Sequence, residues 1–364
     1  MTMLTLFVIG GLLAVLVDIA ALIVWKSPSK KTHEDSELPN VSVLIPMRNE
    51  AMNVKGLVEC IRSLDYPPEK IEILIGEDRS EDHTRQLLEQ EIGFDGRFKI
   101  VSIIKDIPGL KAKANVIAQL IPHCHTSFYF ITDADVRVPT TWVRVLLPYH
   151  TNGTGVIGGS TVVSVRDLWS GLQNIDWLIA QGLLFVVGSR FQTLAVSGTN
   201  MMITRAVCEA IGGYHKIPYS LTEDIGIITA ARNNGFSPKI VLTQGATAVI
   251  EAQPNWTSLI SQRTRWTYGA LRLPKFIVLL LLIRSLFLFF VIAVAWWNPV
   301  TAMVLYLSKV IIDWIFIRRV ACYLGQKISF MHFLCFEVFS NLVSTSGLIK
   351  YLYSANINWK GRNY

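Results

Sequence analysis

The chain opens with a nearly unbroken apolar run over residues 3–25, in which Asp18 is the one ionisable side chain. A helix of this length can cross the hydrocarbon core of a bilayer. A cleavable signal peptide is the alternative, but it would carry basic residues before the apolar run and a small-residue cleavage site after it. In this chain the basic residues follow the run and no such site is evident. We therefore predict a transmembrane anchor over residues 1–25.

A short polar segment separates this anchor from the rest of the chain. It contains Lys26, Lys30 and Lys31, and we interpret residues 26–40 as a linker. Basic residues beside a membrane segment favour the cytoplasmic side. The sequence therefore predicts that the following domain lies in the cytoplasm.

Short β-rich runs alternate with amphipathic stretches from residue 41 to about residue 250. The predicted strands cover residues 41–45, 71–75, 99–104 and 127–131, and two predicted helices cover residues 53–63 and 84–90. Such alternation is typical of a mainly parallel sheet flanked by helices, and we place this α/β domain at residues 41–254. Ligands of parallel sheets bind beyond the carboxyl ends of the strands. A functional site is therefore expected in the turns that follow the strands.

The last third of the chain is again apolar. Residues 255–275 form an amphipathic basic stretch that suits a membrane surface. Two apolar runs follow at residues 276–297 and 299–317, and we predict that each is a transmembrane helix. Trp296 and Trp297 lie at the turn between these two runs. Indole rings favour the boundary between lipid and water, so this turn suits the membrane interface.

A final apolar segment at residues 328–349 is more polar than the two before it. It includes Glu337 and Asn341, and a basic tail over residues 350–364 follows. If the segment crossed the membrane, that tail would lie outside, against the charge bias of membrane proteins. We favour an interfacial or re-entrant helix over a transmembrane one, with a cytoplasmic tail. The whole pattern predicts a multi-pass membrane protein, in the cell membrane if its source is bacterial.

Composition agrees with a membrane protein and excludes other classes. Of the 364 residues, 51% are hydrophobic, and the mean hydropathy is +0.39. The net charge of +7 comes largely from residues beside the apolar runs, and no basic stripe or nucleic-acid-binding motif appears, so nucleic acid is not an expected partner. The five cysteines show no CxxC spacing, so neither a zinc site nor a disulfide framework is predicted.

Charged residues follow the first two predicted strands. Pro46, Arg48 and Glu50 come after the first, where a charged turn can contact a nucleotide, although an ordinary strand-to-helix turn is the alternative. Asp78 comes after the second, and its carboxylate can accept hydrogen bonds from a base or a ribose. The polar residues behind Asp78 suit a helix cap. We predict that Asp78 is functional.

Two lysines lie at the expected start of another helix. Lys111, Lys113 and Asn115 stand where N-terminal amides and ammonium groups favour an anion. A solvated lysine pair is the alternative. Because it lies between the acidic turns, Lys113 is a candidate ligand of an anionic donor.

Asp133 and Asp135, the DxD pair, directly follow the apolar strand at 127–131. Two carboxylates this close repel each other unless a cation lies between them. Mg²⁺ or Mn²⁺ prefers such oxygen ligands and can bridge to phosphates. We predict that the DxD pair holds a divalent cation and that Asp133 also binds the donor.

Glu223 and Asp224 stand before an apolar helical stretch at residues 225–231. One interpretation is that they only complement the helix dipole. We favour a second one, because other acidic turns accompany them. In it Asp224 is a general base that takes the proton from an incoming hydroxyl group, and Glu223 lies on the acceptor side.

Gln262, Arg265 and Trp266 lie within the basic amphipathic stretch. Gln262 and Arg265 are candidate donor ligands, since a guanidinium can contact a diphosphate through two parallel hydrogen bonds. Trp266 offers an apolar face to a sugar ring on the acceptor side. A basic aromatic interfacial helix needs no active site to explain it, so this motif is weak alone. Together with the acidic turns it indicates a membrane-bound sugar transferase.

Four motifs occur in a fixed order along the chain: Asp78, Asp133-Ala134-Asp135, Asp224 and Gln262-x-x-Arg265-Trp266. This ordered set resembles the membrane-bound branch of family 2 glycosyltransferases, the group that contains cellulose, hyaluronan and chitin synthases and ceramide glucosyltransferase. The resemblance spans roughly residues 41–266 and continues into the C-terminal helices. It implies an α/β domain of the GT-A type, a UDP-sugar donor and an inverting displacement at the anomeric carbon.

The resemblance also implies roles for single residues. Asp78 would hold the uridine, the DxD pair would hold UDP and its metal, and Asp224 would act as the base. Arg265 would stabilise the leaving diphosphate, and Trp266 would bound the acceptor.

The acceptor is expected to be a lipid or a glycan. We favour a lipid, because a translocating synthase needs a channel and few membrane segments are predicted. Ionisable residues within the predicted spans, such as Lys309 and Asp313, either pair with one another or line a site for a lipid headgroup. A processive polysaccharide synthase is one alternative. A non-catalytic membrane scaffold or transporter with a degenerate nucleotide-binding domain is the alternative from another class.

Overall fold

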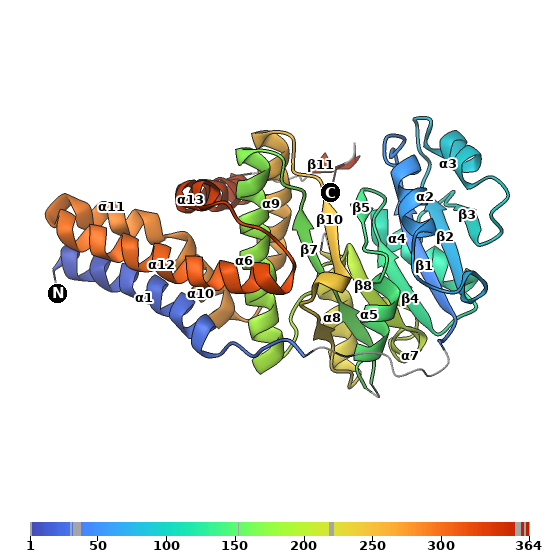
Figure 1. The fold of residues 1–364 in the computed structure, drawn as a ribbon, viewed down its shortest axis with the longest axis horizontal. Helices are drawn as coiled ribbons and strands as arrows, with labels where there is room; N and C mark the ends of the chain where they lie inside the picture. Colours follow the sequence, from blue (N-terminus) through green and yellow to red (C-terminus); the bar gives the residue numbers. More distant parts are fainter. Residues whose placement is uncertain are drawn as a thin grey trace. The chain divides into compact units, whose positions relative to one another are not determined.

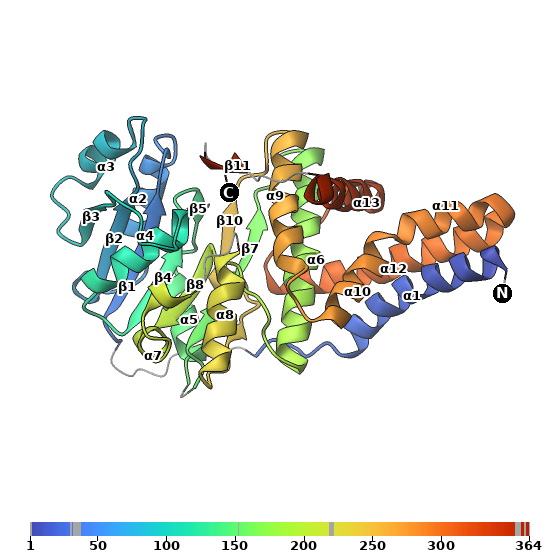
Figure 2. The same ribbon diagram turned by 180° about the vertical axis from the view of Figure 1, so that it is seen from behind.

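The computed structural model describes residues 2–29, 31, 38–151, 153–217, 222–353, 358–359 and 362–363. The chain forms two units. The α/β unit consists of Pro28–Val162 and Val187–Glu251. The helical unit consists of Met1–Ser27, Val163–Val186 and Ala252–Tyr364. Figures 1 and 2 show the elements of each from opposite sides.

A seven-stranded sheet in the order β3-β2-β1-β4-β8-β6-β9 is the centre of the α/β unit. The first four of these strands are parallel, whereas β8 is antiparallel to both β4 and β6. Its strands are β1 (Val41–Met47), β2 (Ile71–Glu77), β3 (Phe98–Ser102), β4 (Phe128–Thr132), β6 (Val156–Gly158), β8 (Asn200–Thr204) and β9 (Lys239–Ile240). A smaller sheet contains β5 (Val136–Arg137), β10 (Thr247–Ile250) and β7 (Ser160–Val163). The four predicted strands are confirmed as β1 to β4, with ends shifted by at most two residues.

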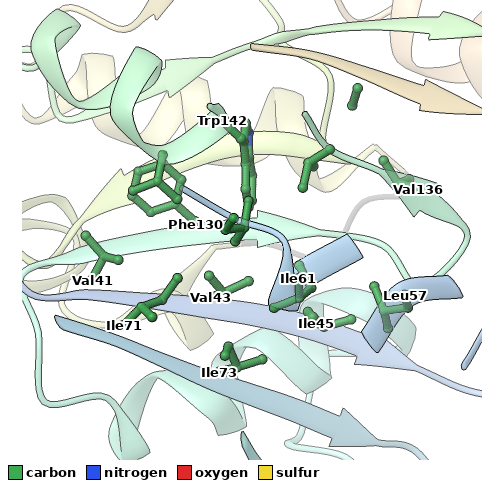
Figure 3. Close-up of a cluster of buried hydrophobic side chains, with 14 of the residues drawn as sticks. Val41, Val43, Ile45, Leu57, Ile61, Ile71, Ile73, Phe130, Val136 and Trp142 are labelled. Atoms are coloured by element: carbon green, nitrogen blue, oxygen red, sulfur yellow. The ribbon is translucent and has the colours of Figure 1, made fainter. Parts of the chain in front are cut away.

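Helices cover both faces of the large sheet, so its central strands are buried on both sides. In β1, Val41, Val43 and Ile45 belong to one core and Leu44 to the other. The first core also contains Trp142, which packs edge-to-face on Phe130 at a centroid distance of 5.2 Å (Figure 3). The α-helices are α2 (Val54–Arg62), α3 (Thr84–Ile92), α4 (Ala112–Leu120), α5 (Trp142–Leu146), α7 (Arg205–Ala210) and α8 (Glu223–Asn233). Short 3₁₀ turns occur at Pro68–Lys70, Ile121–His123, Leu147–Tyr149, Tyr214–Lys216 and Gln244–Ala246.

Asn200 links the two sheets from a fully buried position at the start of β8. Its side-chain oxygen accepts a hydrogen bond from the Trp142 indole at 2.7 Å. Its amide nitrogen donates to the carbonyl groups of Ser160, at 2.7 Å, and Ala246, at 2.8 Å. Every polar atom of this side chain is therefore used, and its three partners have no access to water.

The helical unit contains most of the apolar runs. Its helices are α1 (Met3–Ile23), α6 (Leu168–Arg190, which extends beyond the unit), α9 (Trp256–Ala270), α10 (Lys275–Ser285), α11 (Phe287–Trp297), α12 (Pro299–Tyr323) and α13 (Phe330–Tyr353). A short antiparallel pair, β11 (Asn358–Trp359) and β12 (Arg362–Asn363), follows. Helices α1, α11 and α12 lie alongside one another, whereas α13 is seen end-on in both views and therefore runs across them (Figures 1 and 2).

Two helices in the described part of the chain, α1 and α12, are each long and apolar enough to cross a membrane. The pair α10 and α11 would make a third span if its two helices are counted as one. The sequence predicted one transmembrane helix over residues 276–297, whereas the structure has two helices there. That this pair forms one span stays a prediction. The two helices meet at a bend of 47°.

The bend has a physical cause in the neighbouring helices. The backbone amide of Leu288, just after the break, donates to the Asn341 side chain of α13 at 3.2 Å. Arg284, just before the break, forms an ion pair with Asp18 of α1. Both contacts are made with residues distant in sequence, so the apolar run itself gave no sign of the break. The helix predicted over residues 299–317 is part of α12, which continues to Tyr323. That it crosses a membrane stays a prediction.

A network of charged side chains lies inside this group of helices. Lys309 lies 2.5 Å from Asp313, 3.1 Å from Asp18 and 3.6 Å from Glu337. Arg284 pairs with Asp18 and lies 3.4 Å from Asp313. The predicted pairing of Lys309 with Asp313 is thus confirmed, and it forms part of a network that joins α1, α10, α12 and α13.

We predict that Asn200→Leu destabilises the α/β unit. The substitution leaves one indole and two carbonyl groups buried without partners, at a cost of about 3–6 kcal/mol. The melting temperature of the detergent-solubilised protein should fall by about 10 °C or more. Asn233→Ala, at an exposed position in α8, serves as the control and should melt like the wild type. An unchanged melting temperature in Asn200→Leu would contradict the role assigned to this side chain.

Candidate active site

Asp78 directly follows β2 and is buried at the carboxyl edge of the sheet. Its amide donates to the Met47 carbonyl of β1 at 2.9 Å, which continues the pairing of β1 with β2 by one residue. Arg79, whose φ of +54° turns the chain back, lies 2.8 Å from the Asp78 carboxylate and 2.6 Å from Asp106. The Asp78 side chain is therefore held in one orientation. Sequence reasoning missed Arg79 and Asp106, because a left-handed arginine cannot be recognised from residue type.

Pro46, expected after the first strand, lies within β1 and is paired with Gly76 of β2, whereas Arg48 and Glu50 lie in the turn after β1. Arg48 donates to the carbonyl oxygen of Asp78 at 2.8 Å and contacts Glu81 at 2.6 Å. Buried Glu50 accepts a hydrogen bond from Asn53 at 2.6 Å. Arg48 thus fixes the neighbouring turn after β2. The predicted contact of these residues with a nucleotide stays a prediction.

Lys113, in the first turn of α4, connects two of the predicted motifs. Its ammonium lies 2.6 Å from Asp133 and 3.4 Å from Glu223, and it donates to the Gly198 carbonyl at 2.8 Å. The side chain is only 11% exposed. Burial alone would lower the pKa of Lys113, but the charges of Asp133, Glu223 and Asp224 outweigh burial and raise it. Lys113 therefore stays charged and offers a cation to this edge of the sheet.

Asp133 and Asp135 lie just after β4, as predicted. Asp133 is partly buried against Lys113, and Asp135 is exposed. Among the residues that the structure describes, no group of three or more histidine, cysteine or acidic side chains could hold a metal ion. The DxD pair can supply two oxygen ligands, so the remaining ligands of Mg²⁺ or Mn²⁺ would come from phosphates and water. The residues fit a cation that arrives with a diphosphate.

Glu223 and Asp224 are the first two residues of α8. A side chain at Gly198 would place its Cβ 3.1 Å from the Glu223 carboxylate and 3.3 Å from Cβ of Asp224, so this glycine allows their close approach. Burial, and next the charge of Glu223, raises the pKa of Asp224 to about 7, although the Ile225 amide and Lys113 act in the opposite direction. A carboxylate with a pKa near neutrality can accept and release a proton at physiological pH.

The α/β unit thus brings several predicted residues together at one edge of its sheet. Lys113 joins the DxD pair to the start of α8. Asp78 and Asp133 follow β2 and β4, which flank β1, so the two residues lie on either side of β1 at the same edge of the sheet. Asn115, two residues further along α4 than Lys113, donates to Asp106 at 3.1 Å and so helps to hold Arg79.

Gln262, Arg265 and Trp266 lie on α9, in the helical unit. The Trp266 ring packs edge-to-face with Trp177 of α6 at a centroid distance of 4.8 Å. Arg263, which sequence reasoning passed over, lies over the Trp266 ring at 3.9 Å from its centroid. The predicted contacts of Arg265 with a diphosphate and of Trp266 with an acceptor stay predictions.

The chain is similar to known glycosyltransferases. It is 25% identical over 243 residues to the probable glycosyltransferase YdaM of Bacillus subtilis, and the match covers 64% of this chain and 56% of that protein. It is 22% identical over 244 residues to the beta-monoglucosyldiacylglycerol synthase of Synechocystis, with 64% and 48% covered. The chain thus spans about half the length of these relatives.

A solved structure confirms the predicted fold. The mannosyltransferase PcManGT from Pyrobaculum calidifontis, in complex with GDP-Man and Mn²⁺, has a TM-score of 0.63 and 18% sequence identity. The match covers 96% of this chain and 99% of that one. The fold is therefore the GT-A type, a mostly parallel sheet flanked by helices, with apolar helices at both ends. A specific likeness to ceramide glucosyltransferase or to the cellulose synthases stays a prediction.

The sequence profile of one family extends over almost the entire chain, from residue 4 to residue 364. It includes the strand-end carboxylates, Lys113 and the motif on α9. The protein belongs to glycosyl transferase family 21.

Proposed function

We propose that this protein is an inverting glycosyltransferase that moves a sugar from a UDP-sugar to a hydroxyl group of a lipid at the membrane surface. The observation that carries the proposal is the position of Lys113 between Asp133, of the DxD pair, and Glu223, beside Asp224. Binding groups for a diphosphate and a candidate base therefore meet at one edge of the sheet. A non-catalytic scaffold would have no need to keep them together.

The proposed reaction is a single displacement. The acceptor oxygen attacks the anomeric carbon, the bond from this carbon to the diphosphate oxygen breaks, and the nucleoside diphosphate leaves. Attack opposite the leaving group inverts the anomeric centre. Asp224 takes the proton of the attacking hydroxyl, because burial keeps its pKa near neutrality.

The leaving diphosphate gains negative charge as its bond to the sugar breaks. A divalent cation on Asp133 and Asp135 would offset that charge. Lys113 supplies a fixed positive charge at the same edge, so little reorganisation is needed during the reaction. Asp78, oriented by Arg79, is suited to bind the nucleoside.

The lipid acceptor and the uridine nucleotide are the finer parts of the proposal. The name of the Synechocystis relative supports a lipid acceptor. The PcManGT structure holds GDP-Man, so a GDP-sugar is the competing donor. A processive polysaccharide synthase is the competing function, and it would differ by lengthening its product.

The proposed membrane arrangement follows from the helical unit. Helices α1 and α12 and the bent pair α10–α11 would cross the bilayer, with the α/β unit on the cytoplasmic side. Because α13 runs across them, it would lie along the membrane surface (Figures 1 and 2). Its exposed residues Met331, Leu334, Val338 and Leu342 recur every three or four positions and form one apolar stripe, which suits an interfacial helix.

The proposal is tested by donor and acceptor panels on purified protein in nanodiscs. UDP-glucose, UDP-galactose, UDP-N-acetylglucosamine and GDP-mannose are each supplied with Mn²⁺ or Mg²⁺ and with diacylglycerol or a total lipid extract. We expect transfer from one UDP-sugar to a single lipid product, detected by mass spectrometry. A ladder of lengthening products would support the processive synthase. Equal slow hydrolysis of all donors, without any glycosylated product, would support the scaffold.

We predict that Asp224→Asn lowers kcat by about 10²- to 10⁴-fold, the usual effect of losing a general base. UDP binding in the presence of Mn²⁺ should stay near the wild-type value. In the wild type, kcat/KM should fall as the pH drops through about 7, because Asp224 becomes protonated. Asp65→Asn, an exposed position, is the matched control and should show normal kinetics. An active Asp224→Asn enzyme would show that the base is misassigned.

The same variant has a second readout, in stability. The pKa of Asp224 is higher in the folded protein than in an unfolded chain, so folding becomes less favourable as the pH rises from about 4 to about 7. Asparagine lacks this penalty. Asp224→Asn should therefore melt at a higher temperature than the wild type at pH 8, and the difference should shrink towards pH 4. An equal difference at all pH values would contradict the raised pKa.

We predict that Asp135→Ala weakens the binding of UDP at saturating Mn²⁺ by about tenfold or more, since one of two protein ligands of the cation is lost. Binding without metal should change little. Isothermal titration with and without Mn²⁺ measures both effects, and Asp65→Ala is the control. Identical titrations for the variant and the wild type would argue against metal binding by the DxD pair.

A further inference from the structure

Arg263 is buried within α9, although the basic stretch around it suggests a solvated face. Its guanidinium pairs with Asp176 of α6: Nε donates to one carboxylate oxygen at 2.9 Å, and Nη2 lies 2.7 Å from the same oxygen without making a hydrogen bond. The Asp176 side chain is itself only 20% exposed. An ion pair withdrawn from water costs desolvation, so it needs good geometry to persist.

The same guanidinium contacts two residues of the motif on α9. Its Nη1 donates to the Gln262 side-chain oxygen at 2.6 Å. Its central carbon lies 3.9 Å from the centroid of the Trp266 ring, and Trp177 packs against that ring from α6. One planar cation therefore connects Asp176, Gln262 and Trp266.

Helix α13 packs against Cβ and the backbone of Arg263. A side chain at Gly347 would place its Cβ 3.2 Å from Cβ of Arg263, a tight contact, so α13 packs closely against α9 at this glycine. Three residues further along α13, Lys350 donates to the Ser261 hydroxyl at 2.8 Å. The backbone of α9 beside Arg263 is thus fixed by α13, and its guanidinium is fixed by α6.

We propose that Arg263 and Asp176 are positioning residues for sugar transfer, which hold the Gln262 amide and the Trp266 ring in their working orientation. The inference rests on the proposed function and on the sequence-based prediction that Gln262 contacts the donor and Trp266 the acceptor. Arginine is required because its fork bonds Asp176 and Gln262 at once while its plane stacks on the indole. A lysine keeps the charge but cannot make these contacts together.

The simpler explanation is that the ion pair only joins α6 to α9. Arg263→Lys separates the two explanations, because it preserves an ion pair with Asp176. Positioning predicts that Arg263→Lys and Asp176→Asn both lower kcat by about 10- to 100-fold, as expected for misplaced active-site groups. Binding of UDP with Mn²⁺ should weaken less than turnover falls, since Asp78, Asp133 and Lys113 of the α/β unit are unchanged and only the predicted Gln262 contact is disturbed. The assay uses UDP-glucose and diacylglycerol, or the active pair from the panels.

Asp65→Asn is the matched control, since it also removes the acid of an Arg–Asp pair, with Arg144 at 3.1 Å, but at an exposed position in the α/β unit. Melting temperatures of all variants report on folding. Normal turnover in Arg263→Lys would overturn the proposal. Equal losses of UDP binding and turnover, with a lower melting temperature, would also overturn it in favour of the simple helix contact.

A readout without substrate keeps the proposal separate from the proposed function. The protein is labelled with 5-fluorotryptophan, and the ¹⁹F resonance of Trp266 is assigned by its loss in Trp266→Phe. We expect this resonance to shift or broaden in both Arg263→Lys and Asp176→Asn, and to stay unchanged in Asp65→Asn. If it moves while no donor is used even by the wild type, the proposed function fails and the positioning of Trp266 stands. If it does not move, the positioning inference fails even in an active enzyme.

Discussion

The candidate active site depends on one positive charge, that of Lys113, among three carboxylates. Lys113 lies between the turn after β4 and the start of α8, two segments far apart in the chain. Without a cation, Asp133, Glu223 and Asp224 would repel one another and oppose the packing that brings these segments together. Burial alone would disfavour the charged form of Lys113, but the nearby carboxylates favour it. The ammonium in turn reduces the repulsion between the carboxylates. The resting site therefore already contains the charge balance that an anionic ligand and its metal would adjust.

The carboxylates at this edge differ in their surroundings. Metal binding and proton transfer require carboxylates with different properties. Asp133 lies directly on Lys113, and Asp135 faces solvent. Asp224 is shielded beside Glu223, and its pKa is raised. Two carboxylates separated by one residue at the end of a strand suit a metal, whereas one whose pKa is raised to about 7 suits proton transfer. All three residues are aspartates, and their properties differ because Asp133 and Asp135 follow β4 whereas Asp224 lies at the start of α8.

The parts of the structure that the sequence revealed are those set by local pattern. Strands β1 to β4 are β-branched runs bounded by turns, and parallel strands end at one edge, so Asp78 and Asp133 were predictable as neighbours. The break between α10 and α11 was not predictable, because Asn341 and Asp18 stabilise it from distant helices. Arg263 was missed for a similar reason, since its burial depends on Asp176, in a different helix. The local sequence therefore indicates candidate functional residues, whereas contacts between distant segments determine the orientation of their side chains.

The charge network of the helical unit has a consequence for how the protein is made. Asp18 is synthesised early, and its partner Arg284 follows 266 residues later. For a helix that enters a bilayer, a lone aspartate costs up to about 2.5–3.5 kcal/mol, and less towards a helix end, where Asp18 lies. The leucine and valine residues of α1 therefore offset this cost while the ribosome is still translating the α/β unit. Once α10 and α12 have been synthesised, the Asp18 carboxylate can pair with Arg284 of α10 and Lys309 of α12. Because α1 is translated first, the later helices α10 and α12 pack against a helix that is already in place.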